Sequence, residues 1–187
     1  MKYNVLKINR YVLGEYAIVP LRKSDIFLVK KWRNAQMDIL RQNIKLTDKD
    51  QREYYEHTFL PSCSSSSSAI ILFSFLFENK CIGCGGLTNI DWYSRRAEMS
   101  FLVDVKRVAD KRLYRKDIAA FIALIKRAAF DDLGLNRIFT ETFDLRNFHI
   151  LMLEENGFVL EGRMKEHVFV NGKYVDSLIH GLLRGSS

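Results

Sequence analysis

The spacing of apolar residues divides the first part of the chain into one strand and two helices. Residues 23–43 carry apolar side chains at helical intervals, which predicts an amphipathic helix. A second helix is predicted to begin at Thr47, because Thr47 and Asp50 have the spacing of a capping box. The strand that precedes both helices is expected to end near Pro20, a residue that limits strand pairing.

Apolar runs separated by short turn sequences predict three consecutive strands in the middle of the chain. They cover residues 69–78, 81–91 and 96–104, and the short connections favour antiparallel pairing. A long helix follows within residues 111–130, with one apolar face formed by Ile118, Phe121, Ile122, Ile125 and Ala129.

The last third of the chain is predicted to contain a strand, a short helix and a hairpin. The strand covers residues 137–143, and the helix ends at Asn156-Gly157. Asn171-Gly172 between alternating runs is a strong hairpin signal. The strand at residues 96–104 and the strand at residues 137–143 are joined by a helix, and this connection favours a parallel pair between them. A mixed α/β layer arrangement is therefore expected.

Length and composition predict one domain without a membrane segment. The chain has 187 residues, and its richest apolar run is far shorter than the roughly 20 residues that cross a bilayer. Its start does not resemble a signal peptide, so a cytoplasmic protein is expected. Residues 61–68 read as a flexible, serine-rich loop. Cys81 and Cys84 should point to opposite faces of a strand, which argues against a metal or redox site.

The charge pattern predicts an anionic partner. A formal net charge of +7 fits nucleic acid, an anionic membrane surface or a phosphorylated small molecule, and also fits a solvated basic surface. Four cations, Lys111, Arg112, Arg115 and Lys116, lie at the start of the long helix, where acidic residues are normally preferred. An anion bound at this helix start would explain their position.

Four segments resemble the GNAT acyltransferase superfamily: "AEMSFLVD", "LYRKDIAAFIALIKRAAF", "NRIFTETFDLRNFHILMLEENGFVLEGR" and "VNGKYVDSLIHGLL". The last is similar to the closing hairpin of the branch that contains ribosomal-protein N-terminal acetyltransferases. The resemblance implies a GNAT fold over residues 1–187, an α/β (α+β) single domain with a mixed, mostly antiparallel twisted sheet flanked by helices. It also implies acetyl-CoA as the acetyl donor. The four histidines have no metal-ligand spacing, so no metal is expected.

The resemblance places the donor site in three regions: the end of the strand at residues 101–103, the start of the basic helix, and residues 146–147. Backbone groups of Phe101, Leu102 and Val103 would hold the pantetheine arm. The coenzyme A pyrophosphate would lie at the start of the basic helix. Arg146 occupies a position that is often asparagine in the family, and Asn147 is adjacent to it. The remaining residues implied are Arg112, Arg115, Lys116, Asp117, Ile118, Ala119, Arg146 and Asn147. In this alignment Asp117 and Ala119 stand at the two glycine positions of the family's loop.

Glu98 is the candidate general base, since related enzymes use an acidic residue on this strand to accept the proton of the amine. A salt bridge with Arg95 or Arg96 is the alternative role. The tyrosine that many GNAT enzymes use as the acid is replaced by Leu153. His149 lies in a segment that is expected to face the same cleft, where a packed core histidine is the simpler interpretation.

The acceptor is predicted from "KWRNAQMDILRQN", which resembles enzymes that acetylate nucleotide-linked amino sugars in pseudaminic-acid-type pathways. The candidate acceptor-binding residues are Arg33, Asn34, Arg41, Gln42 and His180. A protein amino terminus is the competing acceptor, and a non-catalytic GNAT-like protein that binds acyl-CoA is a second alternative. Nucleic-acid binding would rest on net charge alone. A homodimer is an open expectation.

Overall fold

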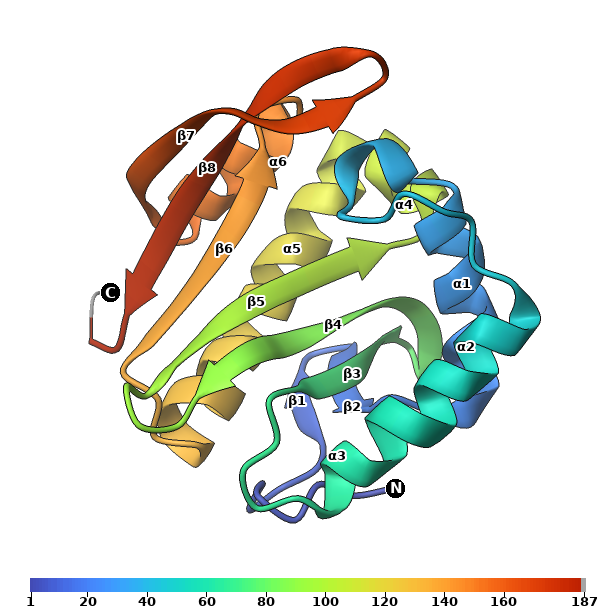
Figure 1. The fold of residues 1–187 in the computed structure, drawn as a ribbon. Coiled ribbons are helices and arrows are strands. Elements are labelled where there is room, and N and C mark those ends of the chain that lie inside the picture. Colours follow the sequence, from blue (N-terminus) through green and yellow to red (C-terminus); the bar gives the residue numbers. More distant parts are fainter. Residues whose placement is uncertain (186–187) are drawn as a thin grey trace.

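An open sheet of eight strands organises residues 1–185, the part of the chain that this computed structural model describes. The strands lie in the order β1-β2-β3-β4-β5-β6-β8-β7 (Figure 1). Their bounds are β1 Tyr11–Leu13, β2 Tyr16–Pro20, β3 Ile71–Phe77, β4 Lys80–Asp91, β5 Arg96–Val103, β6 Arg137–Phe143, β7 Val159–Val170 and β8 Lys173–Leu183. The predicted order of strands from β2 onward, the end of β2 at Pro20 and the closing hairpin are confirmed, whereas β1, which pairs with β2, was not predicted.

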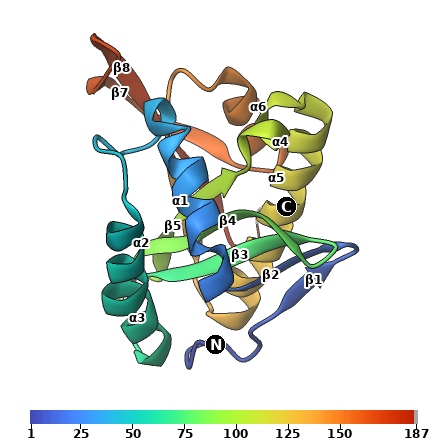
Figure 2. The ribbon, with the colours of Figure 1, turned by 90° about the vertical axis from the view of Figure 1, so that its right-hand side faces the viewer.

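Helices cover both faces of this sheet. Figure 2 shows α1, α2 and α3 on one face, and α5 and α6 on the other. The helical segments are η1 Lys23–Asp25, α1 Ile26–Asn34, η2 Met37–Ile39, α2 Asp48–Tyr54, η3 Tyr55–Phe59, α3 Leu60–Ser64, α4 Val105–Ala109, α5 Lys111–Lys126, η4 Arg127–Asp132 and α6 Asn147–Glu155. The arrangement is the mixed, mostly antiparallel sheet flanked by helices that the sequence predicts.

A single parallel pair, β5 with β6, interrupts an otherwise antiparallel sheet within residues 1–185. The two strands pair only where Arg96–Glu98 faces Arg137–Phe139. Beyond Glu98 they diverge, with α5 behind the space between them (Figure 1). The predicted parallel step is confirmed, and its short length leaves one edge of β5 without a partner strand.

The apolar face of α5 forms the centre of the core. Ile118, Phe121, Ile122 and Ile125 are each at most 1% exposed, as their spacing predicts. The Phe121 ring centroid lies 4.8 Å from that of Phe101 on β5. Burying side chains of this size stabilises the fold by ~1.5–3 kcal/mol each. This packing fixes β5, and with it the candidate base Glu98, against α5.

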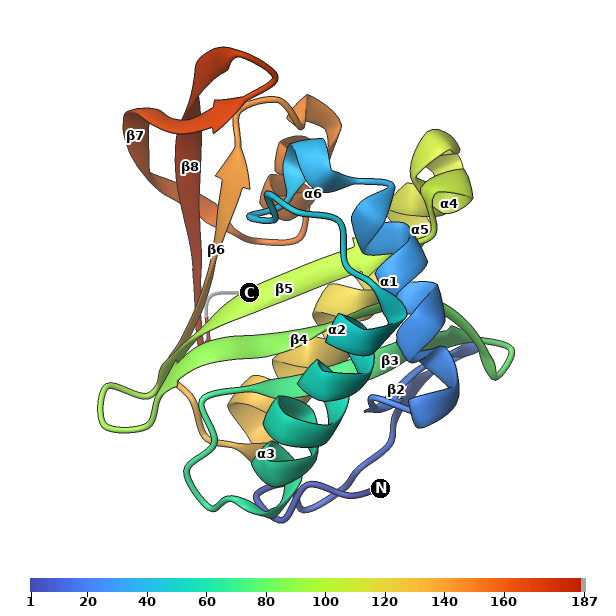
Figure 3. The ribbon, with the colours of Figure 1, turned by 45° about the vertical axis from the view of Figure 1, so that its right-hand side comes forward.

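The first helix is shorter than the predicted span of residues 23–43. It ends at Asn34, because the Asn34 side chain binds the backbone of Leu46 instead of facing solvent: Oδ1 accepts the Leu46 N–H at 2.9 Å, and Nδ2 donates to the Leu46 carbonyl at 2.8 Å. Gln36 Nε2 then donates to the Trp32 carbonyl at the end of the helix. These contacts turn residues 35–46 into a loop that contains η2 and passes in front of α6 and the end of β5 (Figure 3).

The second helix begins with the capping box that the sequence predicts. The Asp50 N–H donates to Thr47 Oγ1 at 3.2 Å, and the Thr47 N–H donates to Asp50 Oδ2 at 2.7 Å. The helix continues through a π-helical turn into α3, so the first half of the predicted serine-rich loop is helical up to Ser64. Pro61 lies in the first turn of α3, directly after the π-helical turn.

The expectation that Cys81 and Cys84 point to opposite faces is wrong, because β4 contains a bulge. Cys84 pairs with Ser74 and Cys81 with Leu76, two residues on the same face of β3. Both thiols are free, and burial raises the pKa of Cys81 to about 12 and that of Cys84 to about 11. Neither is poised as a reactive thiolate. Among residues 1–185, no cluster of His, Cys, Asp or Glu side chains could hold a metal ion.

No helix among the described residues is long and apolar enough to cross a membrane.

Replacing Gly86 by alanine should destabilise the sheet. Gly86 has a φ of +152°, and a Cβ there would collide with the Ile71 carbonyl oxygen and lie 3.0 Å from the Leu72 Cα. We expect the free energy of unfolding to fall by about 3 kcal/mol in urea titrations. Gly162→Ala is the matched control, since a Cβ at Gly162 meets no atom within 4 Å. Equal stability of the two variants would contradict this account of β4.

Candidate active site

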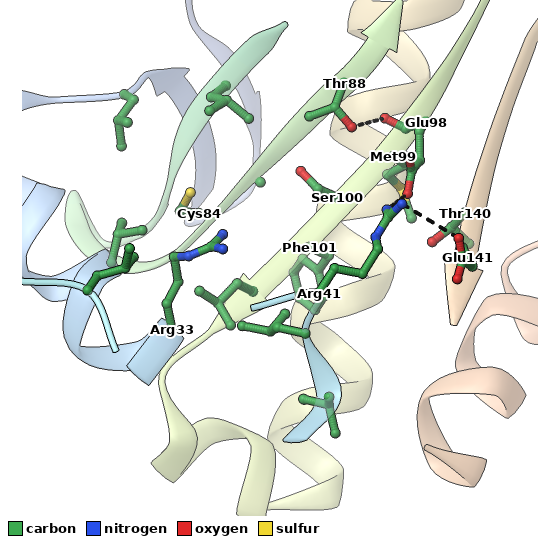
Figure 4. A pocket seen from close by; sticks show the side chains of 18 of the residues that line it. Arg33, Arg41, Cys84, Thr88, Glu98, Met99, Ser100, Phe101, Thr140 and Glu141 are labelled. Atoms are coloured by element: carbon green, nitrogen blue, oxygen red, sulfur yellow. Dashed lines mark hydrogen bonds and ion pairs between the residues drawn. The ribbon is translucent and has the colours of Figure 1, made fainter. Parts of the chain in front are cut away.

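A cavity of about 410 Å³ opens where β5 leaves β6. Its floor is formed by β4 and β5, one wall by α1, α2 and the loop of residues 35–46, and the other wall by β6 and α6. Figure 4 shows Glu98, Ser100, Thr140 and Glu141 around it, with Arg33 and Arg41 extending toward it from the α1 side. The lining combines a broad apolar surface with charged groups of both signs.

Glu98 is a buried carboxylate held by two partners. It is 5% exposed, Arg41 forms an ion pair with its Oε1, and Asn89 Nδ2 donates to its Oε2 at 2.7 Å. Such pairing is what a carboxylate needs when it is removed from water. The predicted alternative partners, Arg95 and Arg96, are not the ones that the structure uses, because Arg96 pairs with Asp91.

Arg41 joins the two sides of the cavity. Its Nη1 lies 3.5 Å from Glu141 Oε2 on β6, so one guanidinium stands between the carboxylates of Glu98 and Glu141 (Figure 4). The Arg41 side chain is 55% exposed, whereas those of Glu98 and Glu141 are 6% and 12% exposed. The arginine is therefore the movable member of the group, and the two carboxylates are fixed by their strands.

The other residues predicted for acceptor binding on α1 and its loop form one network. Arg33 Nε donates to Gln42 Oε1 at 2.9 Å, and Gln42 Nε2 donates to Asn34 Oδ1 at 2.9 Å. Arg33 also lines the cavity. Asn34 and Gln42 hold the loop in place, which positions the neighbouring Arg41.

The unpaired edge of β5 lies along the cavity. Phe101, Leu102 and Val103 pair with β4 on one side, and no strand within residues 1–185 pairs with their other side. The Val103 carbonyl accepts a hydrogen bond from Gln36 Nε2 at 3.0 Å. Backbone groups on such an edge need partners, and an extended amide-containing ligand can supply them.

At the start of α5, the chain satisfies its own backbone donors. Asp110 is the N-cap residue, and its Oδ1 accepts the N–H groups of Arg112 and Leu113, each at 3.0 Å. Asp104 caps the preceding short helix α4 in the same way, through Lys106. A carboxylate thus occupies the position where the sequence predicts a bound anion.

The cations around this helix start differ in their availability. Arg112 and Lys116 are exposed, and Arg115 is paired with Glu155 at 2.6 Å. Arg107 is instead drawn inward by Asp117, with Nε 2.6 Å from Oδ2.

Asp117 and its two neighbours in the alignment lie away from solvent. Asp117 is fully buried and also accepts a hydrogen bond from the Tyr16 hydroxyl, while Ile118 belongs to the core and Ala119 is half-buried. Asp117 therefore faces the interior with its charge neutralised, and does not approach the helix start.

Arg146 and His149 lie on α6 or immediately before it and line the cavity, and a tyrosine from α5 contacts both behind this lining. The Tyr114 hydroxyl is 2.7 Å from His149 Nδ1, and Arg146 Nη2 donates to the same hydroxyl at 3.2 Å. Burial, followed by the charges of Arg146 and His180, holds the pKa of His149 well below its usual range. Asn147 is exposed at the start of α6.

His180 does not line this cavity. It is fully buried on β8, opposite Thr140 of β6, and neither ring nitrogen has a hydrogen-bond partner among residues 1–185. The Oε1 atom of Glu154 lies 3.6 Å from its Nε2. The structure therefore separates His180 from Arg33, Asn34, Arg41 and Gln42, the other residues predicted for the acceptor.

Comparison with known proteins identifies the family. A family model described as an acetyltransferase (GNAT) domain matches residues 18–179. The chain belongs to the GNAT acetyltransferase family. As an N-acetyltransferase of this family it uses acetyl-CoA as the acetyl donor. The sequence has no significant match among the curated proteins.

Solved structures of GNAT enzymes have the same fold. Spermidine N-acetyltransferase from Vibrio cholerae in complex with CoA and spermine is 20% identical, with a TM-score of 0.79, over 93% of this chain and 98% of that chain. RimL, a ribosomal L7/L12 alpha-N-protein acetyltransferase in complex with coenzyme A, is 14% identical, with a TM-score of 0.75, over 95% and 98% of the two chains. At these identities the likeness shows the fold.

The two parts of the chain predicted to hold the donor differ in how well they would fit acetyl-CoA. The open edge of β5 has backbone groups that could pair with the pantetheine amides, which fits the prediction. The helix start offers exposed cations, but Asp110 already holds the N–H groups of Arg112 and Leu113. A diphosphate that binds there must displace or lie beside a like charge.

Three contributors to this site were not predicted from the sequence, namely Asp110, Tyr114 and Glu141. Asp110 carries a readable signal, because an aspartate just before a helix is a common N-cap. Tyr114 is visible in the sequence as part of the basic segment, but its partner His149 comes from another helix. Glu141 reaches the cavity only because β6 diverges from β5.

Replacing Asp110 by asparagine should tighten donor binding. Asparagine keeps the cap and removes the negative charge, so the dissociation constant for acetyl-CoA should fall by roughly three- to tenfold in calorimetric titration, about 1 kcal/mol. Asp131→Asn is the control, since Asp131 is an exposed residue at the opposite end of the same helical segment. Unchanged affinity in Asp110→Asn would place the diphosphate elsewhere.

Proposed function

We propose that this N-acetyltransferase acetylates the primary amine of a small molecule bound in the cavity, a nucleotide-linked amino sugar being the leading candidate. The observation that carries the proposal is the position of Glu98, a buried carboxylate at the β5–β6 divergence. Arg33 and Arg41 line the same cavity, and guanidinium groups suit phosphate oxygens through paired hydrogen bonds. The proposed setting is the cytoplasm, which the free thiols of Cys63, Cys81 and Cys84 support.

The cavity assigns separate tasks to the groups around it. Glu98 accepts the proton that the amine loses when it attacks the thioester carbonyl. The unpaired N–H groups of β5 hydrogen-bond the donor and polarise its carbonyl, since preorganised donors act strongly where water is excluded. Arg41 leaves Glu98 when the acceptor binds, because the arginine is the exposed partner of that pair.

A specific observation also favours a cationic acceptor. Glu98 and Glu141 hold one guanidinium between them, and an ammonium group could take that place. The spermidine enzyme with the same fold is described in complex with spermine, and RimL is described as acting on a protein amino terminus. Both acceptors carry an amine that is cationic near neutral pH. A polyamine and a peptide amino terminus are therefore the competing acceptors.

Arg41→Gln should separate these acceptor classes by the direction of its effect. For an acceptor with phosphate groups, the loss of a charge-assisted hydrogen bond should raise KM by about tenfold or more. For a polyamine or a peptide amino terminus, removing the competing cation should lower KM. The assay is release of the CoA thiol with a panel of UDP-linked amino sugars, spermidine and short peptides. No transfer to any phosphate-bearing acceptor would exclude the leading candidate.

Glu98→Gln should reduce turnover more at low pH than at high pH. A base matters less when more of the amine is already neutral, so kcat should fall by about 100-fold at the acidic end of the profile and by less at the alkaline end. Glu141→Gln is the matched variant, because it also removes a carboxylate beside Arg41 but leaves Glu98 in place. A uniform loss across pH, or the same profile in both variants, would remove Glu98 from the role of base.

A further inference from the structure

The structure lacks a tyrosine at the family's acid position and places another tyrosine nearby. Leu153 on α6 is fully buried among core residues and carries no proton to donate. Tyr114 on α5 lies 2% exposed, with its hydroxyl 2.7 Å from Nδ1 of His149. His149 lies on the same helix as Leu153, one turn earlier, and lines the cavity. A hydroxyl from a different helix therefore connects to the cavity through an imidazole.

Hydrogen-bond directions fix which nitrogen of His149 carries the proton. Arg146 Nη2 can only donate, so at 3.2 Å it occupies a lone pair of the Tyr114 oxygen. Within residues 1–185 the sole acceptor near the Tyr114 hydroxyl is His149 Nδ1, which therefore receives its hydrogen. A neutral imidazole that accepts at Nδ1 must carry its proton on Nε2. The series of hydrogen bonds thus leads from Arg146 through Tyr114 to His149, and the last group in it is the Nε2–H of His149.

The groups around His149 keep its ring neutral. Tyr114 faces it from α5, Arg146 from the segment before α6, and His180 from β8. From β5 the Phe101 ring stacks on the imidazole, with centroids 6.4 Å apart and planes 6° apart. Burial and the positive charge of Arg146 both disfavour an imidazolium, so His149 stays a neutral hydrogen-bond donor through the physiological range.

We propose that His149 donates its Nε2 proton to the sulfur that leaves during acetyl transfer, with Tyr114 as the proton source behind it. The inference rests on acetyl transfer taking place in this cavity. Attack by the amine forms the C–N bond and breaks the C–S bond, and the electron pair of the broken bond stays on sulfur. His149 protonates that sulfur through Nε2, and the Tyr114 hydroxyl proton moves to Nδ1.

The proton balance of this step closes with groups that are present. The imidazole ends neutral, and the guanidinium of Arg146 beside the Tyr114 phenolate opposes the rise that burial causes in the pKa of Tyr114. Glu98 holds the proton that the amine has lost. Release of one proton from Glu98 to solvent, uptake of one proton at His149 Nε2 and return of the Nδ1 proton to Tyr114 restore the starting state. A leaving-group donor of this kind contributes roughly 10²- to 10⁴-fold to rate.

The first experiment compares His149→Phe with His149→Gln, using acetyl-CoA and hydroxylamine as a small, neutral acceptor. Phenylalanine keeps the stack on Phe101 but has no donor, whereas the glutamine amide keeps an N–H group. We expect kcat to fall about 100-fold in His149→Phe, with partial recovery in His149→Gln. KM for acetyl-CoA should change less than about threefold, because the interaction forms in the transition state. A kcat within twofold of the wild type in His149→Phe would overturn the inference.

The second experiment tests the tautomer without any reaction. A two-bond ¹H–¹⁵N spectrum of the full chain, with the His149 signals assigned from their loss in His149→Gln, should show the proton on Nε2. Tyr114→Phe should weaken this preference and lower kcat by about tenfold or more. Tyr3→Phe is the control, since it removes another buried hydroxyl, one that bonds to the backbone of Leu72. A proton on Nδ1 in the wild type would overturn the relay.

The outcomes distinguish this inference from the proposed function. If the wild type acetylates hydroxylamine and both His149 variants keep its kcat, the relay fails and the acetyltransferase site stands. If the wild type transfers acetyl to no acceptor, the site and the relay fall together. Circular dichroism melts of every variant show whether a loss of rate reflects unfolding.

Discussion

The divergence of β5 from β6 after Glu98 is the constraint on which the site depends. The strands pair through three residues on each side and then separate, so backbone groups of β5 are left along the cavity. The same separation places Glu141 across from Glu98, with Arg41 between them. It also leaves room for His149 to stack on Phe101. If the parallel pairing continued to Val103, none of these groups could face a ligand.

Buried carboxylates determine which cations remain for ligands. Asp117 engages Arg107, Asp25 engages Arg22 at 2.6 Å, and Glu98 engages Arg41. A carboxylate removed from water needs such a partner, so these arginines stabilise the fold before they can serve a ligand. The net charge of +7 therefore overstates the positive charge that a phosphate would meet. The exposed Arg112 and Lys116 are better placed for that contact than Arg107.

The sequence predicted the elements well and the site only in part, for a physical reason. Periodicity reports local burial, so the apolar face of α5, the capping box at Thr47 and the Asn171-Gly172 hairpin were all predicted. The spacing of apolar residues does not predict side-chain contacts between segments that are far apart in the sequence. The Asn34 contacts with Leu46 that end α1, the bulge in β4 that brings Cys81 and Cys84 to one face, and the link between Tyr114 and His149 needed the structure. The resemblance to GNAT enzymes supplied the family and the candidate base, but could not place their partners.

At the start of α5 and in the cavity, a charge of the chain already occupies the place expected for a ligand group of the same sign. Asp110 accepts hydrogen bonds at the start of α5, where a diphosphate would bind. Arg41 pairs with the carboxylates of Glu98 and Glu141, where an amine would bind. This keeps polar groups satisfied in the empty protein, which unpaired groups would destabilise. It also means that a ligand gains only the difference between its own contacts and those that it displaces. A doubly charged diphosphate can outcompete one carboxylate, and a dication can outcompete one guanidinium, whereas singly charged analogues gain little from the exchange.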